Sequence, residues 1–98
     1  MARVEKPSKL PRVAPEVIYK ASVERDLTNL TPGDAERIIV KLESVLRGDG
    51  RKGEALSGRF EGLFKLRVGE YRVIYTRTGR GYLVLRIGHR REVYEKGL

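Results

Sequence analysis

The sequence predicts an α+β domain in which an N-terminal strand and a helical hairpin precede an antiparallel sheet of about three further strands packed on the helices. Three observations predict this fold class. A β-branched and aromatic segment lies at 16–21, two segments with helical apolar spacing lie between 22 and 48, and apolar residues alternate with polar ones from residue 62 onward. A chain of 98 residues that contains this succession of strand, helices and sheet once is expected to form one domain.

The N-terminal segment contains Pro7, Pro11 and Pro15 among mixed charges. It is expected to be an extended or disordered lead-in over 1–15, so that 16–98 form the domain. The first strand is then expected at 16–21.

The helical hairpin is predicted from two helix starts. Ser22 is a candidate N-cap for a short helix from Val23 to about Leu30, and Thr31 is a candidate N-cap for a second helix with Pro32 at its first position. Gly48 is expected to end the second helix. The apolar residues of this helix recur at helical spacing and predict one core-facing stripe, formed by Ala35, Ile38, Ile39, Leu42, Val45 and Leu46.

Residues 47–59 are rich in glycine and basic residues and are predicted to form a loop. Backbone N–H groups of such a loop can approach phosphate, which makes Arg51, Lys52 and Arg59 candidate RNA contacts. The alternative is a mobile connector without a binding role. The loop is not a nucleotide-binding P-loop, because the Gly-Lys-Ser/Thr sequence is absent.

Residues 62–76 read as two strands joined at Gly69-Glu70, since glycine at the first position of a two-residue loop suits a tight hairpin turn. This turn opposes Arg67 to Arg72 and Lys65 to Ile74. Like charges directly opposed on a sheet are destabilising, so this face is expected to bind an anion. The other face is apolar and consists of Phe64, Leu66, Val68, Tyr71, Val73 and Tyr75.

A further strand is expected over residues 82–88, after a loop at 77–81. Leu83, Leu85 and Ile87 form the more apolar face of this strand and are expected to join the core. A five-residue loop then places Arg86 opposite Arg72, so Arg86 and Arg90 would extend the cationic face of the hairpin.

The net charge of +8 is unevenly distributed. Residues 59–91 hold nine Lys/Arg against two Glu, whereas residues 16–46 hold four Lys/Arg against six Asp/Glu. A basic surface built by one part of a fold is typical of a nucleic-acid binder. The alternative, a solvated charged face, explains a one-sided balance less well.

The composition argues against several other classes of protein. The chain has no cysteine and one histidine, His89, so thiolate chemistry and a histidine-rich metal site are not expected, and neither is a small-molecule cofactor. His89 is more readily explained as a strand end than as a catalytic group. No apolar run is long enough for a membrane span, and the N-terminus lacks a signal-peptide core, so a cytoplasmic protein is expected.

A cationic sheet face can still catalyse RNA cleavage. RNA carries its own nucleophile, the 2′-OH, so the protein need only align it and stabilise the charge on the phosphate. Lys65, crowded by arginines, is a candidate general base, and Tyr94 can stack on a base or position a phosphate. The alternatives are a solvated Lys65 and ion pairs from Arg67 and Arg72 to a carboxylate such as Glu61 or Glu70.

Three segments carry a resemblance to a known family. Leu56-Ser-Gly58, Phe64-Lys-Leu-Arg-Val-Gly-Glu-Tyr-Arg-Val-Ile-Tyr75 and Gly88-His-Arg-Arg-Glu-Val-Tyr94 resemble the RelE/ParE toxin superfamily, closest to its RelE branch. The resemblance implies a compact α+β toxin of a type II toxin–antitoxin system. RelE-like members cleave mRNA in the ribosomal A site by 2′-OH attack, without metal, and inhibit translation.

The resemblance also implies site residues and partners. Lys65, Arg72, Arg90 and Tyr94 match the catalytic positions. The expected partners are the ribosome with its mRNA and a cognate antitoxin that wraps the toxin with an acidic or amphipathic segment. RNA contacts are expected from the other basic residues of this half, Arg67, Arg86, Arg59, Arg51, Lys52 and Arg91.

Two other functions fit the same residues. One is a ParE-like inhibitor of DNA gyrase, which shares the fold but acts by binding. The other is a catalytically inactive relative that binds RNA or the ribosome with a steep salt dependence.

Overall fold

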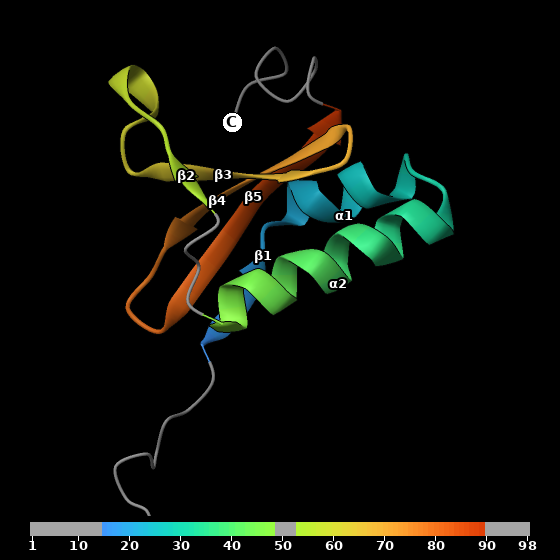
Figure 1. The fold of residues 1–98 in the computed structure, drawn as a ribbon, viewed down its shortest axis with the longest axis horizontal. Helices are drawn as coiled ribbons and strands as arrows, with labels where there is room; N and C mark the ends of the chain where they lie inside the picture. The colour runs from blue at the N-terminus through green and yellow to red at the C-terminus, as the bar shows by residue number, and fades with distance from the viewer. Residues whose placement is uncertain (1–14, 49–52, 90–98) are drawn as a thin grey trace, which may run out of the picture.

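The computed structural model describes residues 15–48 and 53–89, and its order of elements confirms the predicted α+β class (Figure 1). The predicted lead-in lies, apart from Pro15, outside these residues. Among the described residues no helix is long and apolar enough to cross a membrane. The elements follow one another as β1 (Glu16–Tyr19), α1 (Ala21–Thr28), α2 (Pro32–Gly48), β2 (Glu54–Ala55), a 3₁₀ helix (Gly58–Phe60), β3 (Leu63–Val68), β4 (Tyr71–Arg77) and β5 (Gly81–His89).

The sheet is five-stranded and mixed, in the order β1-β5-β4-β3-β2. Strands β3, β4 and β5 are antiparallel, as predicted, and β2 is antiparallel to β3, whereas β1 pairs parallel to β5 at the edge. The helical hairpin between β1 and the rest of the sheet is the connection that lets β1 run parallel. The two-residue strand β2 lies inside the segment that was predicted to be only a loop.

Helix α2 begins as the sequence predicts. The Thr31 hydroxyl accepts a hydrogen bond of 3.2 Å from the Asp34 backbone N–H, so Thr31 caps the helix. The predicted cap of α1 is wrong. Lys20 is the N-cap residue, and Ser22 lies inside the first turn, where its hydroxyl donates to the Leu85 carbonyl at 3.0 Å. Ser22 therefore joins α1 to β5.

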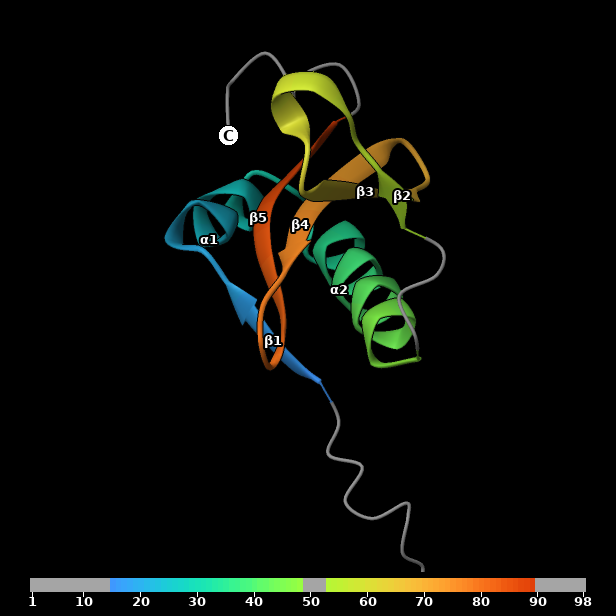
Figure 2. The same ribbon diagram turned by 90° about the vertical axis from the view of Figure 1, so that its left-hand side faces the viewer.

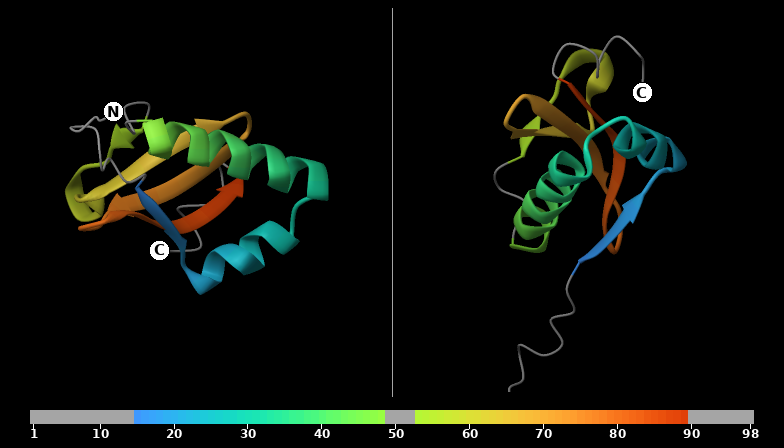
Figure 3. Two further views of the ribbon diagram at one scale, coloured as in Figure 1. Left: turned by 90° about the horizontal axis from the view of Figure 1, so that it is seen from below. Right: turned by 90° about the vertical axis from the view of Figure 1, so that its right-hand side faces the viewer.

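The core lies between α2 and one face of the sheet (Figure 3). Ile38, Leu42 and Leu46, one stripe of α2, are fully buried, and Val23 closes the core from α1. Each such side chain stabilises the fold by about 1.5–3 kcal/mol through burial. The sheet contributes Leu66, Val68, Val73, Tyr75, Val84 and Ile87, with Phe64 and Tyr71 packed against them. The apolar face predicted for the hairpin is thus confirmed.

The turn between β3 and β4 is also as predicted. Gly69 has a φ of +60°, a left-handed conformation that glycine adopts without a steric penalty. The resulting register opposes Arg67 to Arg72 and Lys65 to Ile74. A two-residue loop fixes which residues face each other, so this register follows from the loop length.

The pairing of β4 with β5 contains a β-bulge that the sequence did not predict. Ile74 opposes Arg86 and Tyr75 opposes Val84, so β5 carries one additional residue, Leu85, between these pairs. A bulge shifts the side-chain alternation of its strand by one position.

This shift overturns the predicted core contribution of β5. Val84 and Ile87 are buried, whereas Leu83 and Leu85 are only partly buried and lie outside the core cluster. The prediction assumed uninterrupted alternation and was correct only for Ile87, on the far side of the bulge.

Helix α1 takes the place of a strand along the second half of β5. β1 pairs with Gly81–Val84, and the Lys20 N–H then donates to the Val84 carbonyl at 2.9 Å. Beyond that point the chain continues as α1, which lies beside the edge of β5. In this view α2 lies on the opposite side of β5 from α1 (Figure 2). Side chains of α1 therefore meet the backbone groups of β5 that β1 leaves unpaired.

Replacing Gly81 with alanine is expected to lower the free energy of unfolding by about 1–3 kcal/mol. A Cβ at this position would overlap the backbone nitrogen and carbonyl oxygen of Glu16, where β1 pairs with β5. Urea unfolding measures the change. Gly79→Ala is the matched control, because its Cβ would meet no atom within 4 Å. A Gly81→Ala variant as stable as Gly79→Ala would contradict the tight β1–β5 pairing.

Alkaline pH is expected to destabilise the fold partly through Tyr19. Its hydroxyl donates to Glu43 at 2.5 Å, and burial together with the Glu43 carboxylate raises the pKa of Tyr19. A raised pKa in the folded state stabilises the fold below the ordinary value of about 10, and this contribution is lost as the pH rises further. We expect Tyr19→Phe to show a shallower loss of stability as the pH rises above about 10. Equal slopes in the two proteins would contradict this linkage.

Candidate nucleic-acid interface

Three cations share the sheet face that points away from α2. Strands β3 and β4 place Lys65, Arg67 and Arg72 on it, with Arg67 directly opposite Arg72. Ile74 lies on the same face, between Lys65 on β3 and Arg86 on β5, and is fully buried although it is outside the helix-facing core. The face is thus a cationic surface with an apolar floor, which we call the basic face (Lys65, Arg67, Arg72).

Lys65 has a carboxylate neighbour that sequence reasoning missed. Its Nζ lies 3.8 Å from Oε1 of Glu54, which β2 brings opposite it. The Glu54 side chain is 72% exposed, so this ion pair contributes at most about 1 kcal/mol and an incoming phosphate can displace it. A two-residue strand gives almost no periodic signal, which is why the pairing could not be predicted.

The two arginines of the basic face are not used in ion pairs. Within residues 15–48 and 53–89, neither Arg67 nor Arg72 forms a salt bridge, so the expected alternative of pairing with Glu61 or Glu70 is not observed. The guanidinium of Arg72 instead donates to the carbonyls of Gly69 and Tyr71, at 3.4 and 3.2 Å. Two guanidinium groups that pair with no carboxylate of the described residues therefore face each other across the hairpin.

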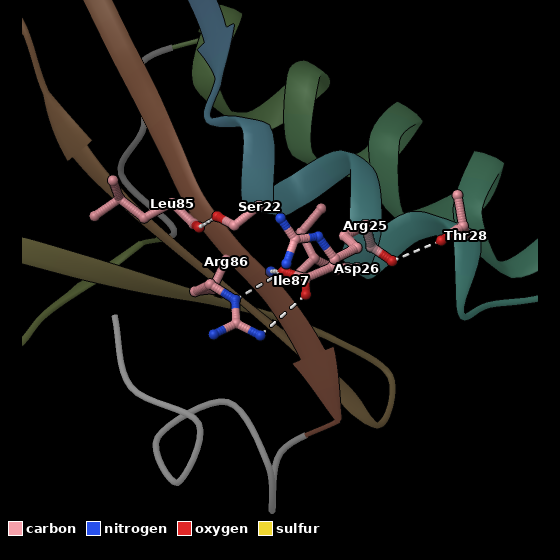
Figure 4. A network of polar contacts seen from close by, with 7 residues as sticks. All are labelled: Ser22, Arg25, Asp26, Thr28, Leu85, Arg86 and Ile87. Atoms are coloured by element: carbon pink, nitrogen blue, oxygen red, sulfur yellow. Dashed lines mark hydrogen bonds and ion pairs between the residues drawn. The ribbon is translucent and has the colours of Figure 1, made fainter.

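Arg86 is engaged in a different contact (Figure 4). Its Nε and Nη2 donate to the two carboxylate oxygens of Asp26 at 2.9 and 3.0 Å. The same carboxylate accepts the Ile87 backbone N–H at 2.9 Å. The side chains of Arg86 and Asp26 are only 17% and 11% exposed, and the hydrogen bonds to Asp26 raise the pKa of Arg86. Asp26 therefore clamps β5 to α1.

The predicted position of Arg86 opposite Arg72 is wrong. Gly88 opposes Arg72, because Arg77 already pairs with Tyr82, which makes the loop one residue shorter than predicted, and the bulge at Leu85 shifts the register by one further position. Arg86 therefore lies opposite Ile74. The row of residues across the sheet is thus Arg67, Arg72 and Gly88, and its last member has no side chain.

The remaining predicted contacts divide into two groups. Arg59 is exposed on the 3₁₀ helix, with its guanidinium 5.1 Å from the centroid of the Phe60 ring. It stays a predicted RNA contact. The other predicted residues lie outside the described residues, namely Arg51, Lys52, Arg90, Arg91 and Tyr94.

A cavity of about 560 Å³ lies at the edge of β5, between α1 and the end of this strand, and its aromatic lining is on the helix side of the sheet. Arg25, Asp26 and Asn29 line it from α1 and its C-cap, while Tyr71 and His89 line it from the sheet. The rings of Tyr71 and His89 meet edge to face at 6.2 Å between centroids. His89 ends β5, as predicted. The cavity itself could not be predicted, because its walls come together only in the tertiary fold.

No cluster of three or more His, Asp or Glu side chains suited to a metal ion occurs in the described part of the chain. The lysine and arginines of the basic face can align a phosphate and stabilise developing negative charge.

The family comparison identifies one match. The family described as "ParE toxin of type II toxin-antitoxin system, parDE" matches residues 17–94, which is most of the chain. No curated protein matches the sequence at a significant level.

Solved structures give the same fold. A chain of the RelBE2 toxin–antitoxin complex from Mycobacterium tuberculosis is 28% identical, with a TM-score of 0.70, over 80% of this chain and 100% of that chain. A chain of the RelE–RelB complex from Pyrococcus horikoshii is 19% identical (TM-score 0.63), over 83% of this chain and all of that one. YafQ from Escherichia coli is 15% identical (TM-score 0.65), over 82% and 98%.

Proposed function

Because this chain belongs to the ParE toxin family of type II toxin–antitoxin systems, we propose that it is a RelE-like toxin, an endoribonuclease that cleaves mRNA in the ribosomal A site and so inhibits translation. The likeness to RelE structures supports the branch. The match to residues 17–94 supports a single toxin domain over 16–98. A ribosomal target places the toxin in the cytoplasm.

The observation that carries the proposal is the basic face. Arg67 and Arg72 oppose each other on adjacent strands without a salt bridge in the described chain. Lys65 lies two residues before Arg67 on β3 and therefore on the same face. Opposed guanidinium groups destabilise the hairpin unless an anion lies over them. A phosphate that bridges them relieves this repulsion, so the face is suited to the RNA backbone.

The proposed chemistry needs no group beyond the RNA and the protein. The 2′-OH attacks the adjacent phosphorus, the P–O5′ bond breaks, and the products carry a 2′,3′-cyclic phosphate and a 5′-OH. Arg72 and Arg67 stabilise the extra negative charge on the phosphorane. Lys65, Arg90 and Tyr94 are the proposed groups for proton transfer and for positioning the reacting nucleotide.

An antitoxin is the proposed protein partner. Three of the similar structures are complexes of RelE with RelB or the RelBE2 toxin–antitoxin pair. A net charge of +8 favours an acidic partner that neutralises the basic face.

The proposal is tested by adding the purified protein to a translating extract and mapping mRNA ends by primer extension. We expect new ends inside A-site codons. An extract in which translation continues and mRNA stays intact would overturn the proposal.

A second candidate is favoured by the family match itself, which is to the ParE toxin. A ParE-like protein would inhibit DNA gyrase by binding rather than cleave RNA. A gyrase supercoiling assay distinguishes the two, since a clear block of supercoiling together with intact mRNA would favour this reading. An inactive relative would bind RNA without either effect.

A further inference from the structure

The cavity at the edge of β5 adjoins the row of residues on the basic face at Gly88. Arg67, Arg72 and Gly88 lie side by side on β3, β4 and β5, and Gly88 also lines the cavity. Neighbouring strands are about 4.8 Å apart, so the row from Arg67 to Gly88 spans about 10 Å. A strand of RNA held on the arginines passes over Gly88, where no side chain obstructs it, and turns around the edge of β5 to reach the cavity, whose aromatic rings lie on the helix side of the sheet.

Hydrogen bonds hold the walls of the cavity on both sides. Asp26 holds Arg86 through two hydrogen bonds and the Ile87 backbone through a third. On the opposite side, the Tyr71 hydroxyl donates to Asp34 at 3.3 Å, which fixes the ring that packs against His89. A cavity with walls tied on both sides needs little reorganisation when it binds a ligand.

The chemistry of the cavity suits a nucleotide. Arg25 and Asn29 are exposed on α1 and its C-cap, and neither side chain forms a hydrogen bond or ion pair with another described residue. Arg25 can bind a phosphate, and the Asn29 amide offers both a donor and an acceptor to a base edge. Tyr71 and His89 supply aromatic surface, on which unstacked RNA bases pack. The volume of about 560 Å³ accommodates one nucleotide.

From these observations we propose that the cavity binds one nucleotide of single-stranded RNA adjacent to the nucleotide held on the basic face. Arg25 contacts its phosphate, Asn29 reads its base edge and His89 packs against its base. The inference rests on the proposed RNA-cleaving function and assigns part of the substrate to α1, an element that carries none of the residues proposed for the chemical step.

An acidic protein segment fits this cavity less well. Asp26 places a carboxylate in the wall, and the aromatic pair and the amide have no counterpart in an acidic chain. Gly88 lies between Arg72 and the cavity, which also favours a ligand that occupies both the basic face and the cavity.

The test measures binding of a short single-stranded 2′-O-methyl RNA, which cannot be cleaved, by fluorescence anisotropy. Arg25→Gln is expected to weaken binding about three- to tenfold and to lower the salt slope of log K by about 0.7, as for one lost phosphate contact. Lys41→Gln, the same change of charge at an exposed position of α2, is expected to leave binding unchanged. Equal binding by Arg25→Gln and wild type would overturn the proposal.

Base recognition is tested with RNAs that carry one abasic site. In the wild type, one abasic position is expected to weaken binding about tenfold, and in His89→Ala the same position is expected to have little further effect. Abasic penalties that are the same in both proteins at every position would overturn the assignment of His89.

Two further outcomes would also overturn the proposal and have different meanings. If poly-glutamate binds the wild type and loses affinity in Arg25→Gln while RNA binding is unchanged, the cavity is a site for an acidic protein segment. If Arg25→Gln binds RNA normally and A-site cleavage is intact, only the cavity assignment fails, whereas a wild type that neither binds nor cleaves RNA removes the proposed function with it.

Discussion

Replacing Arg72 with alanine is expected to slow ribosome-dependent mRNA cleavage by about 10²–10³-fold, as for the loss of one group that stabilises transition-state charge. Arg72 lies on the central strand β4, directly opposite Arg67, and its guanidinium donates two hydrogen bonds to described residues, the carbonyls of Gly69 and Tyr71. The fold should therefore lose little stability. The measurement is the single-turnover cleavage rate on ribosomes with a defined codon in the A site, with thermal unfolding measured alongside.

The matched control for this prediction is Arg80→Ala. Arg80 is exposed in the turn at the opposite end of β4, so the same side chain is removed away from the basic face. We expect wild-type rates from this variant. A fully active Arg72→Ala protein, or an equal loss in Arg80→Ala, would show that net charge rather than this face determines activity.

Replacing Asp26 with alanine is expected to destabilise the fold by about 3–5 kcal/mol, a large fraction of the stability of a small domain. The substitution leaves the guanidinium of Arg86 and the N–H of Ile87 without the carboxylate that satisfies them, in a site where both side chains are largely buried. Urea or thermal unfolding measures the effect.

The control for this prediction is the exposed carboxylate of Glu54, whose alanine variant is expected to change stability by less than about 1 kcal/mol. A double-mutant cycle with Arg86→Met isolates the pair, and we expect a coupling energy of at least about 1 kcal/mol. If Asp26→Ala is as stable as Glu54→Ala, the clamp between α1 and β5 does not hold the strand.

The hairpin of β3 and β4 could be predicted in detail because its information is local. A two-residue loop at Gly69-Glu70 determines the register, and the register determines that Arg67 faces Arg72. The apolar stripe of α2 and its Thr31 cap could be predicted for the same reason, since both depend on spacing along a single element.

The parts of the site on β5 could not be predicted, because they depend on contacts distant in sequence. A loop one residue shorter than predicted and one additional residue at Leu85 together move Arg86 two positions away from Arg72, and nothing in the local pattern indicates that insertion. Asp26 and Arg86 are 60 positions apart in the chain. From the sequence, Asp26 could be recognised only as a charged residue of a short helix. Its hydrogen bonds to β5, where no neighbouring strand pairs with β5, could not be predicted.

The most direct test of the central claim, that the basic face aligns RNA for attack by its own 2′-OH, uses ribosomes programmed with two mRNAs that differ by a single oxygen. One mRNA is fully ribose, and the other carries a 2′-deoxy nucleotide on the 5′ side of the cleaved bond. We expect the first to be cut to a fragment with a 2′,3′-cyclic phosphate end and the second to remain intact at that bond. Cleavage of the deoxy mRNA at the same position and rate would contradict the claim.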